Sequence, residues 1–267
     1  MSGDGGAIGV LEREPAFGER ARAAATGSDV PVGPDAGVMA IMATTRAMRR
    51  LRPDPVPDEL LRRVIEAATW APSPGNWQVA AFLAVTDRET IRRLAVPWRR
   101  VIADYFEILD AAGLIDADDE GQARMRAAID YQRDHFEETP ALVVVCQDSR
   151  GLGPSSRSPS ATVWRLARTA GPRRSVQLLR AWQHLSTGAA GAAFYPAVQN
   201  LLLAARAHGL AACLTTWHML AEDEFTAILG IPNDVRMWAV VPIGWPLGRF
   251  GSVRRRPLDD VIHRDRW

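Results

Sequence analysis

The chain has 267 residues, 47% of them hydrophobic, and a formal net charge of +1. This is enough for one large domain or two small ones, and the near-neutral charge provides no global field that would recruit nucleic acid. The sequence has no run of about 18 apolar residues, so we expect no membrane span, and its start lacks the pattern of a secretory signal. All 32 basic residues are arginines, so any anion held by a side-chain cation is held by a permanently charged guanidinium.

The first 36 residues are rich in Gly, Ala, Pro and charge and have no periodicity. We expect residues 1–36 to form a disordered or loosely ordered arm, followed by a single ordered domain over residues 37–267. That domain should begin with a short helix, VMAIMATT, from Val38. The next helix, PDELLRRVIEAATW, places Pro57 in its first turn, where a missing N–H costs nothing. Its apolar face, at helical period, consists of Leu60, Leu61, Val64, Ile65 and Ala68.

This second helix ends at APSPGNWQ, residues 71–78, which carries two prolines and several short polar side chains. Such a composition is unusual for a simple connection, which is typically two to six residues of ordinary turn formers. The run VAAFLAVT, residues 79–86, is continuously apolar and predicts a strand buried on both faces. Residues 104–138 contain eleven acids and three arginines, which predicts solvated helices.

From Ser149 to Ala221 the chain has no acidic residue, although it has eight arginines there. Two interpretations remain open for this stretch: a surface that balances the acidic helices, or the rim of an anion site. Residues 148–190 are longer than a strand-to-helix connection requires and include two possible short helices, TVWRLARTA and RSVQLLRAW. We therefore interpret residues 148–190 as a possible lid insertion.

The rest of the chain alternates helices and strands. AAFYPAVQNLLLAARAHGL predicts a helix that Gly209 ends in the left-handed conformation. A strand AACLT, a helix EDEFTAILG and a strand MWAVVPIG complete the predicted core, and the polar tail RRRPLDDVIHRDRW follows. Well-separated strands between helices predict an α/β or α+β fold in three layers.

Conventional catalytic motifs are missing from the sequence. The five histidines have no metal-like spacing among themselves or with Cys146 and Cys213, so we expect no metal site. Both cysteines lie in apolar runs typical of strands, which predicts buried, reduced thiols and a cytoplasmic protein. No GxSxG occurs, and GLGPSS lacks the third glycine of a dinucleotide fingerprint, so we assign it to a loop.

Three short polar or cationic segments remain, each at the end of a predicted element: TTRAMRRLR, APSPGNWQ and LTTWHM. Taken singly, they are explained as a charged surface, a helix stop and a strand end. In this order, with the helix QNLLLAA ending in GL and the basic RRRP late in the chain, they resemble the FMN-dependent nitroreductase family. The resemblance covers roughly Val38 to Trp267, and the ending VIHRDRW resembles a bacterial subgroup. It implies an α+β, three-layer α/β/α fold with a mixed, mostly antiparallel sheet, in a domain-entwined homodimer.

The resemblance also implies a role for each segment. The APSPGNWQ loop is expected to reach across the dimer interface to the flavin of the other subunit, which makes the dimer obligate for function. Arg46 and Arg255 are expected to hold the FMN phosphate, with Arg254 and Arg50 as near-equivalent candidates, and Arg49 to lie at the pyrimidine edge of the flavin. The predicted cofactor-binding residues are Arg46, Ala47, Arg49, Arg50, Pro72, Ser73, Pro74, Asn76, Gln78, Leu214, Thr215, Thr216, Trp217, Arg254 and Arg255.

Residues Thr215, Thr216 and Trp217 match the loop whose backbone N–H groups approach the flavin N5. The best-known members have a Glu-Gly pair where this chain has Thr216 and Trp217, and Trp217 is an alternative wall for the substrate cavity. The resemblance implies an NAD(P)H-dependent FMN oxidoreductase that passes hydride via flavin N5 to electron-poor acceptors such as nitroaromatics or quinones. A lid at residues 148–190 that lends arginines to the donor would favour NADPH over NADH.

Rival functions remain open at this point. The same scaffold is compatible with an activated C=C reductase, a dehalogenase or a deazaflavin-dependent reductase. From a different class, the chain is also compatible with a non-catalytic, flavin-binding interaction protein. In the enzyme readings the flavin carries the chemistry, so no side chain is predicted to act as acid, base or nucleophile.

Overall fold

The computed structural model describes residues 37–116, 118–148, 150, 164, 168–169, 174 and 190–267. The predicted N-terminal arm, residues 1–36, and most of the predicted lid, residues 148–190, lie outside the described residues. Helix α2, Val38–Thr44, begins where the sequence predicted the first helix. None of the helices in the described part is long and apolar enough to cross a membrane.

One four-stranded sheet forms the centre of the fold, with the strand order β1-β2-β4-β3. Each pair of described strands is antiparallel, which agrees with the mostly antiparallel sheet that we predicted. The predicted strand AACLT is represented by only two ladder residues. The strands are β1 (Ala80–Val85), β2 (Ala141–Asp148), β3 (Ala211–Ala212) and β4 (Val235–Gly244).

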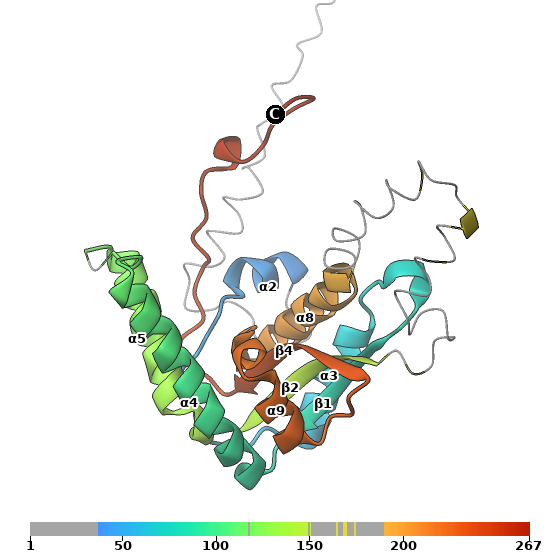
Figure 1. The fold of residues 1–267 in the computed structure, drawn as a ribbon. Helices are drawn as coiled ribbons and strands as arrows, with labels where there is room; N and C mark the ends of the chain where they lie inside the picture. Colours follow the sequence, from blue (N-terminus) through green and yellow to red (C-terminus); the bar gives the residue numbers. More distant parts are fainter. Residues whose placement is uncertain are drawn as a thin grey trace, which may run out of the picture.

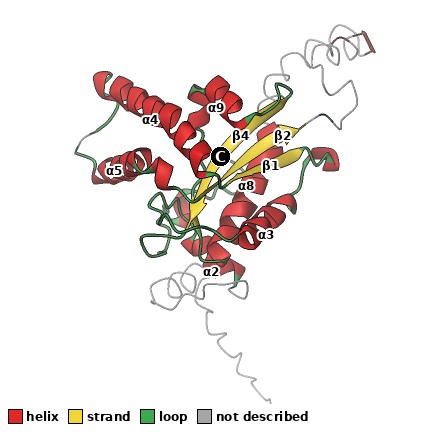
Figure 2. Ribbon diagram, turned by 90° about the horizontal axis from the view of Figure 1, so that it is seen from below, coloured by secondary structure: helices red, strands yellow, loops and turns green. Residues whose placement is uncertain are grey.

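Helices cover both faces of the sheet, as Figures 1 and 2 show: α3 and α8 lie on one face, and α4 and α9 lie on the other. The α5 helix packs along α4 at the outside of the molecule. This arrangement confirms the three-layer α+β fold. The bounds are α3 (Asp58–Thr69), α4 (Arg88–Ala111), α5 (Glu120–Asp134), α8 (Ala190–Ala207) and α9 (Glu222–Leu229).

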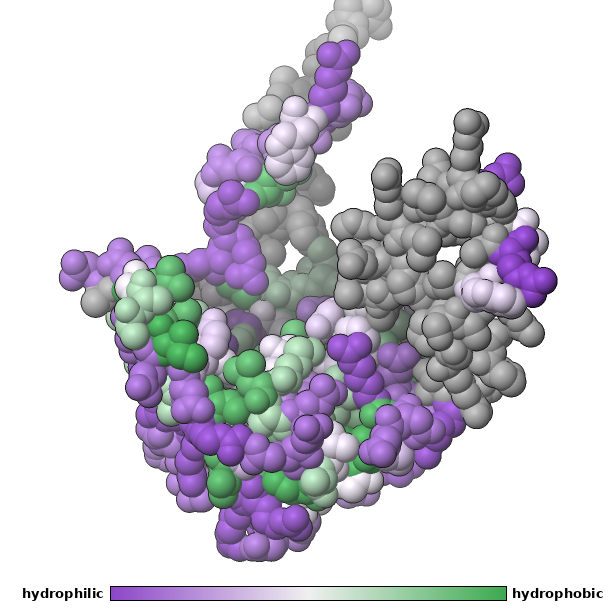
Figure 3. All heavy atoms as spheres, in the orientation of Figure 1, coloured by the Kyte–Doolittle hydropathy of each residue, from purple (hydrophilic) through white to green (hydrophobic). Residues whose placement is uncertain are grey.

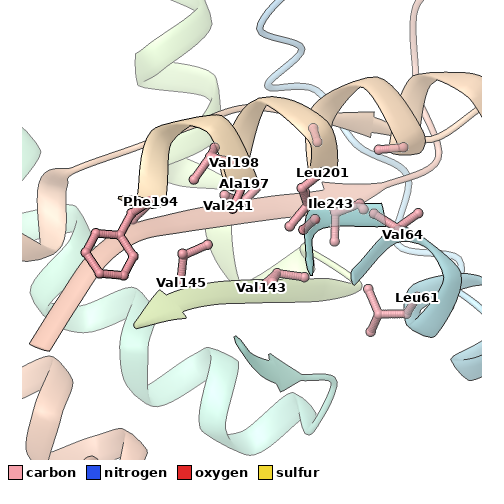
Figure 4. Packing of buried hydrophobic residues seen from close by; sticks show 14 of the residues in the cluster. Leu61, Val64, Val143, Val145, Phe194, Ala197, Val198, Leu201, Val241 and Ile243 are labelled. Atoms are coloured by element: carbon pink, nitrogen blue, oxygen red, sulfur yellow. The ribbon is translucent and has the colours of Figure 1, made fainter. Parts of the chain in front are cut away.

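Two hydrophobic cores result from the alternation of side chains along β2 and β4. On one face, Val143 and Val241 pack against Leu201 of α8, together with apolar residues of α3 (Figure 4). On the other face, Val144 and Val240 belong to a second cluster with residues of α4 and α9. Both central strands are therefore buried on both faces, which explains their nearly continuous apolar sequence.

Two local predictions were wrong. Pro57 lies before the first turn of α3, as its N-cap, with Asp58 as the first helical residue. The β1 strand is mostly half-buried in the single chain instead of buried on both faces. The physical reason is its position at the edge of the sheet, where only β2 is its neighbour. A continuous apolar sequence does not distinguish a central strand from an edge strand that another chain can cover.

The cysteines agree with their prediction. Cys146 and Cys213 are free and buried. Burial raises the pKa of Cys146 to about 11, and burial also raises the pKa of Cys213. Neither thiol is therefore ionised at neutral pH, in keeping with structural cysteines.

Candidate functional site

Two segments near the opposite ends of the described chain lie side by side. The segment that contains TTRAMRRLR runs along residues 245–253, which lead into the predicted phosphate ligands Arg254 and Arg255. Three backbone hydrogen bonds join the two segments: Arg52 N to Trp245 O at 2.8 Å, Leu247 N to Arg50 O at 3.1 Å, and Val253 N to Ala43 O at 2.9 Å. Residues 200 positions apart in the sequence are thus held in one place, as the sequence predicted for an anion site built from both ends.

A short apolar repeat directs the arginines of this segment outward. Met48 and Leu51 are buried and pack with Ala211 and the half-buried ring of Phe250. Because these two residues are three positions apart and face inward, the side chains between and before them face the surface. Arg46 and Arg50 are exposed and Arg49 is half-buried. The local fold therefore displays cations while it anchors the backbone that carries them.

Five arginines make up this surface, and we refer to Arg46, Arg49, Arg50, Arg254 and Arg255 as the arginine cluster. Within the described residues, none of the five forms an ion pair. Arg46 donates from Nη2 to the carbonyl oxygen of Arg249 at 3.1 Å, and Arg50 lies with Cζ 5.0 Å from the ring centre of Tyr131. By contrast, the neighbouring Arg52 pairs with Asp54 at 2.8 Å.

Residues 215–217, whose backbone N–H groups are predicted to approach the flavin, lie in a loop that we call the amide loop. It lies beside the arginine cluster. Arg49 is close enough to Cys213 for its charge to oppose the rise in that thiol's pKa, which burial causes. Thr215 bridges to Val240 in β4 and is buried; its N–H and its hydroxyl both donate to the Val240 carbonyl oxygen, at 3.1 Å and 2.6 Å. In the described chain its N–H is therefore bonded to the sheet, and its predicted approach to a flavin stays a prediction.

The next two residues of the amide loop, Thr216 and Trp217, have backbone N–H groups without an acceptor in the described part of the chain. The reason is that η4 (Trp217–Leu220) begins here and its first amides have no partner inside the helix. Leu214, also predicted, is exposed at the start of the loop. The structure thus leaves two free backbone donors beside the arginine cluster.

Aromatic side chains of α4 pack against the end of the amide loop. The ring of Trp217 is half-buried and meets Tyr105 of α4 edge-on at 5.1 Å between ring centres, with Phe106 at 6.3 Å. The following residue, His218, is completely buried. Burial lowers the pKa of His218 to about 4, so the imidazole is neutral at pH 7.

The APSPGNWQ loop has an unusual backbone conformation. It contains a short 3-10 helix, η1 (Pro74–Asn76), and its backbone takes positive φ at Gly75 (58°), Asn76 (53°) and Gln78 (50°). Positive φ is unfavourable for a residue with a β-carbon, and such strain concentrates at functional positions. The Ser73 hydroxyl accepts from the Gln78 N–H at 3.1 Å, whereas the side-chain amides of Asn76 and Gln78 have no partner within the described part of the chain.

In one chain, this loop and the arginine cluster lie at opposite ends of the sheet. Val79, next to the loop, accepts from the Asp148 N–H opposite the start of β4, and Leu51 bridges to Pro246 beyond its end. The ten residues of β4 that separate them span about 33 Å. The structure thus places predicted residues 46–50 next to the segment that leads into residues 214–217, because the Met48 N–H donates to the Ala212 carbonyl oxygen at 3.3 Å. The hydrogen bond from Val253 to Ala43 brings the chain that leads into Arg254 and Arg255 close to α2. The structure does not bring Pro72, Ser73, Pro74, Asn76 and Gln78 to them.

Sequence reasoning missed Arg206. The interpretation of the acid-free stretch as a charged surface is wrong for this residue, because only 2% of Arg206 is exposed. A signal was present: Arg206 follows Leu202 by four positions, so it lies on the flank of the apolar face of α8. As for metals, no group of three or more His, Cys, Asp or Glu in the described ranges lies together in a way that could hold an ion.

Arginines without ion pairs in the described chain, with free backbone amides close to some of them, suit the binding of an anionic ligand. Residues 42–245 match the model of the nitroreductase family. The chain belongs to the nitroreductase family.

Named relatives extend the comparison. The chain is 29% identical over 227 residues to an NADH dehydrogenase of Thermus thermophilus, covering 81% of this chain and 90% of the relative. It is 20% identical over 224 residues to the iodotyrosine deiodinase of Danio rerio, covering 83% and 65%. Among solved structures, the NADPH:FMN oxidoreductase from Vibrio harveyi complexed with NAD⁺ superimposes with a TM-score of 0.54 at 19% identity, covering 86% of this chain and 77% of that chain. At that identity, the structural likeness shows the fold alone.

Proposed function

We propose that this protein is a homodimeric, FMN-dependent oxidoreductase that takes electrons from a reduced nicotinamide and reduces a small, electron-poor acceptor such as a nitroaromatic or a quinone. The observation that carries the proposal is the arginine cluster, none of whose five members has a carboxylate partner among the described residues. Hydrogen bonds hold the segment that carries Arg46, Arg49 and Arg50 against residues 245–253, which lead into Arg254 and Arg255. The names of the relatives, an NADH dehydrogenase and an NADPH:FMN oxidoreductase, support a nicotinamide donor.

The residues present fit FMN. A terminal phosphate dianion needs two or three forked donors, which Arg46, Arg254 and Arg255 would supply. Arg49 would lie at the pyrimidine edge, where its fixed charge would stabilise electron density gained on reduction. The free N–H groups of Thr216 and Trp217 would donate to the ring system. In the described chain, Arg46 and Arg255 donate to the carbonyl oxygens of Arg249 and Arg254, and none of these cations has a carboxylate partner.

When bound, FMN supplies two-electron transfer between the donor and the acceptor. The protein's own side chains bind, orient and exclude water. Trp217, supported edge-on by Tyr105, offers an aromatic surface beside the free amides, which suits a flat donor or acceptor. His218 is buried next to it and burial depresses its pKa, so it is a structural residue and not a general acid.

A homodimer would complete the site. The APSPGNWQ loop projects side-chain amides with no partner in the described chain, and we infer that they contact the flavin of the other subunit. Several exposed apolar residues support an interface: Trp70 precedes the loop, Trp77 lies within it, and the edge strand β1 is half-exposed. The tail leaves the body of the chain (Figure 1) and is largely hydrophilic (Figure 3), but it exposes Leu258 and Ile262. The free, buried thiols are consistent with a cytoplasmic protein.

The test begins with the purified protein. We expect a yellow protein whose heat-released ligand is FMN and not FAD, identified by chromatography and mass. Anaerobic stopped-flow mixing with NADH or NADPH should bleach the flavin absorbance, and a nitroaromatic or quinone should restore it. A colourless protein that does not take up added FMN would contradict the proposal. A yellow protein that no donor reduces would favour a non-catalytic flavin-binding role.

A dehalogenase is the second candidate, supported by the similarity to iodotyrosine deiodinase. The two functions share a cofactor and differ in the acceptor, so a panel of acceptors separates them. Halide release from a halogenated aromatic, measured under anaerobic turnover, would support the dehalogenase. Activated C=C substrates and a reduced deazaflavin donor belong in the same panel, because the scaffold is compatible with both.

A further inference from the structure

Arg206 is a buried cation near the C-terminal end of α8. Its Nε donates to the Thr44 hydroxyl oxygen of α2 at 3.0 Å, and the Thr44 hydroxyl, itself buried, donates to the Ala40 carbonyl oxygen at 2.7 Å. The ring of Phe250 covers the guanidinium, with Cζ 4.0 Å from the ring centre. Arg206 therefore connects α8, α2 and the C-terminal segment at one point.

This guanidinium lacks an anionic partner. Its Nη1 and Nη2 atoms are buried without a hydrogen-bond acceptor in the described part of the chain. Burial lowers the pKa of Arg206, but a guanidinium stays charged at neutral pH. A comparable arginine shows the difference: Arg126 lies 3.9 Å over the ring of Phe106 and pairs with Asp110 and Asp130. A buried charge without compensation is costly, so its retention needs an explanation.

The explanation lies on the other side of Phe250. The carbonyl of Arg249 accepts from Arg46 at 3.1 Å, and the Arg46 Nη1 atom lies 3.9 Å from where a β-carbon on Gly251 would be. Arg46 and Arg206 thus hold the same three residues from the outside and from the inside. The Val253 N–H then donates to Ala43 at 2.9 Å, immediately before Arg254.

We propose that Arg206 is a positioning residue for the phosphate end of the flavin site. Through Phe250 and Thr44 it fixes residues 249–253 against α2, and so sets where Arg254 and Arg255 stand relative to Arg46. Its uncompensated charge also adds to the positive potential that attracts the phosphate, and the bound dianion is the compensating charge that the described residues lack. The inference rests on the proposed function, because it assumes FMN as the ligand.

Riboflavin and FMN separate this role from a general structural one, since they differ only in the phosphate. We would measure the dissociation constants of both ligands for flavin-free protein by fluorescence quenching. Arg206→Met keeps the volume and removes the charge; we expect FMN affinity to fall about tenfold and riboflavin affinity to change by less than about twofold. Arg206→Lys, which retains the charge, should recover part of the loss. Arg126→Met is the matched control, and its FMN-to-riboflavin ratio should equal that of the parent.

Phe250→Leu covers the case in which Arg206→Met does not fold, because Phe250 is only half-buried. It removes the ring between Arg206 and the phosphate end, and it should also lower FMN affinity more than riboflavin affinity. Equal losses for the two ligands, or no loss in either variant, would overturn the inference while leaving the proposed function intact. A parent protein that binds neither ligand would instead overturn the proposed function itself.

Discussion

The arginine cluster and the APSPGNWQ loop both present polar groups that the described chain does not satisfy, but they are supported in different ways. The backbone of the cluster is anchored by the buried Met48 and Leu51 and by hydrogen bonds to the C-terminal segment. The loop is exposed, carries positive φ at Asn76 and Gln78, and lies at the opposite end of the sheet. Under the proposed function, the first region would be a preformed docking site, whereas the second would contact a ligand held by another chain.

The largest effect should come from the cluster. We expect Arg46→Ala and Arg255→Ala each to weaken FMN binding by about 1.5–3 kcal/mol, because each removes a charge-assisted hydrogen bond to the phosphate. Equilibrium titration of flavin-free protein measures this. Arg52→Ala is the matched control in the same segment, since Arg52 already pairs with Asp54. Unchanged affinity in both cluster variants would remove these residues from the phosphate site.

The free energy of unfolding should depend on pH through His218, the residue that follows the amide loop. His218 has a pKa of about 4 in the folded state, against an ordinary value of 6.5, because it is buried. Between these values the unfolded chain binds the proton more readily, so stability is complete above about pH 6.5 and falls as the pH drops towards 4, by at most about 3 kcal/mol. Urea unfolding at pH 7, 5.5 and 4.5 measures the loss. His218→Leu should flatten this dependence; an identical pH profile in that variant would contradict the assignment.

Backbone strain at Gln78 of the APSPGNWQ loop should lower the stability of the flavin-free protein, although the residue favours FMN binding. Gln78→Gly relieves the positive φ, and we expect the flavin-free protein to gain about 0.5–1 kcal/mol of stability while FMN binding weakens. Gln78→Ala is the control that loses the same amide but retains the strain, so it should weaken binding without the gain. Chemical unfolding and flavin titration of both variants provide the comparison. If Gln78→Gly lowers stability, the backbone there is not strained.

The smallest expected effect concerns the donor. If the arginines of residues 148–190 rim the site, each exposed contact with the extra phosphate of NADPH contributes about 0.5–1 kcal/mol, or roughly tenfold for three together. Arg168 and Arg174 are exposed and are suitable for replacement by alanine. The preference, measured as kcat/KM for both donors, should shrink at high salt because exposed charges are screened. Equal values for NADPH and NADH at low salt would leave these arginines as surface charge.

Sequence reasoning predicted the elements well where periodicity is strong. Helices α3 and α8, with Gly209 in the left-handed conformation after α8, and the central strands β2 and β4 lie where their patterns indicated. It could not predict properties that depend on neighbours that are distant in the sequence. The edge position of β1 follows from strand order, and the use of the Thr215 N–H follows from its pairing with Val240. Neither property is encoded in a local pattern.

The candidate site shows the same division. The spacing of cations in TTRAMRRLR was visible in the sequence, and the structure adds that Met48 and Leu51 turn them outward. Arg206 is buried under Phe250, which is 44 positions away in the sequence. Composition alone therefore predicted this arginine to be part of a charged surface. A buried, unpaired cation becomes recognisable only when its environment is known.

The central claim is that each flavin site takes its arginines from one chain and its APSPGNWQ loop from the other. Heterodimers of an Arg49→Ala subunit and an Asn76→Ala subunit, carrying different affinity tags, test it most directly through their bound flavin and nitroreductase activity. Each homodimeric parent should be defective at both of its sites. If the loop acts across the interface, the heterodimer contains one site with both substitutions and one site with neither, and it should recover flavin and activity at that intact site. Heterodimers of verified composition that recover nothing would show that both residues serve the same chain's site, and the account would be wrong.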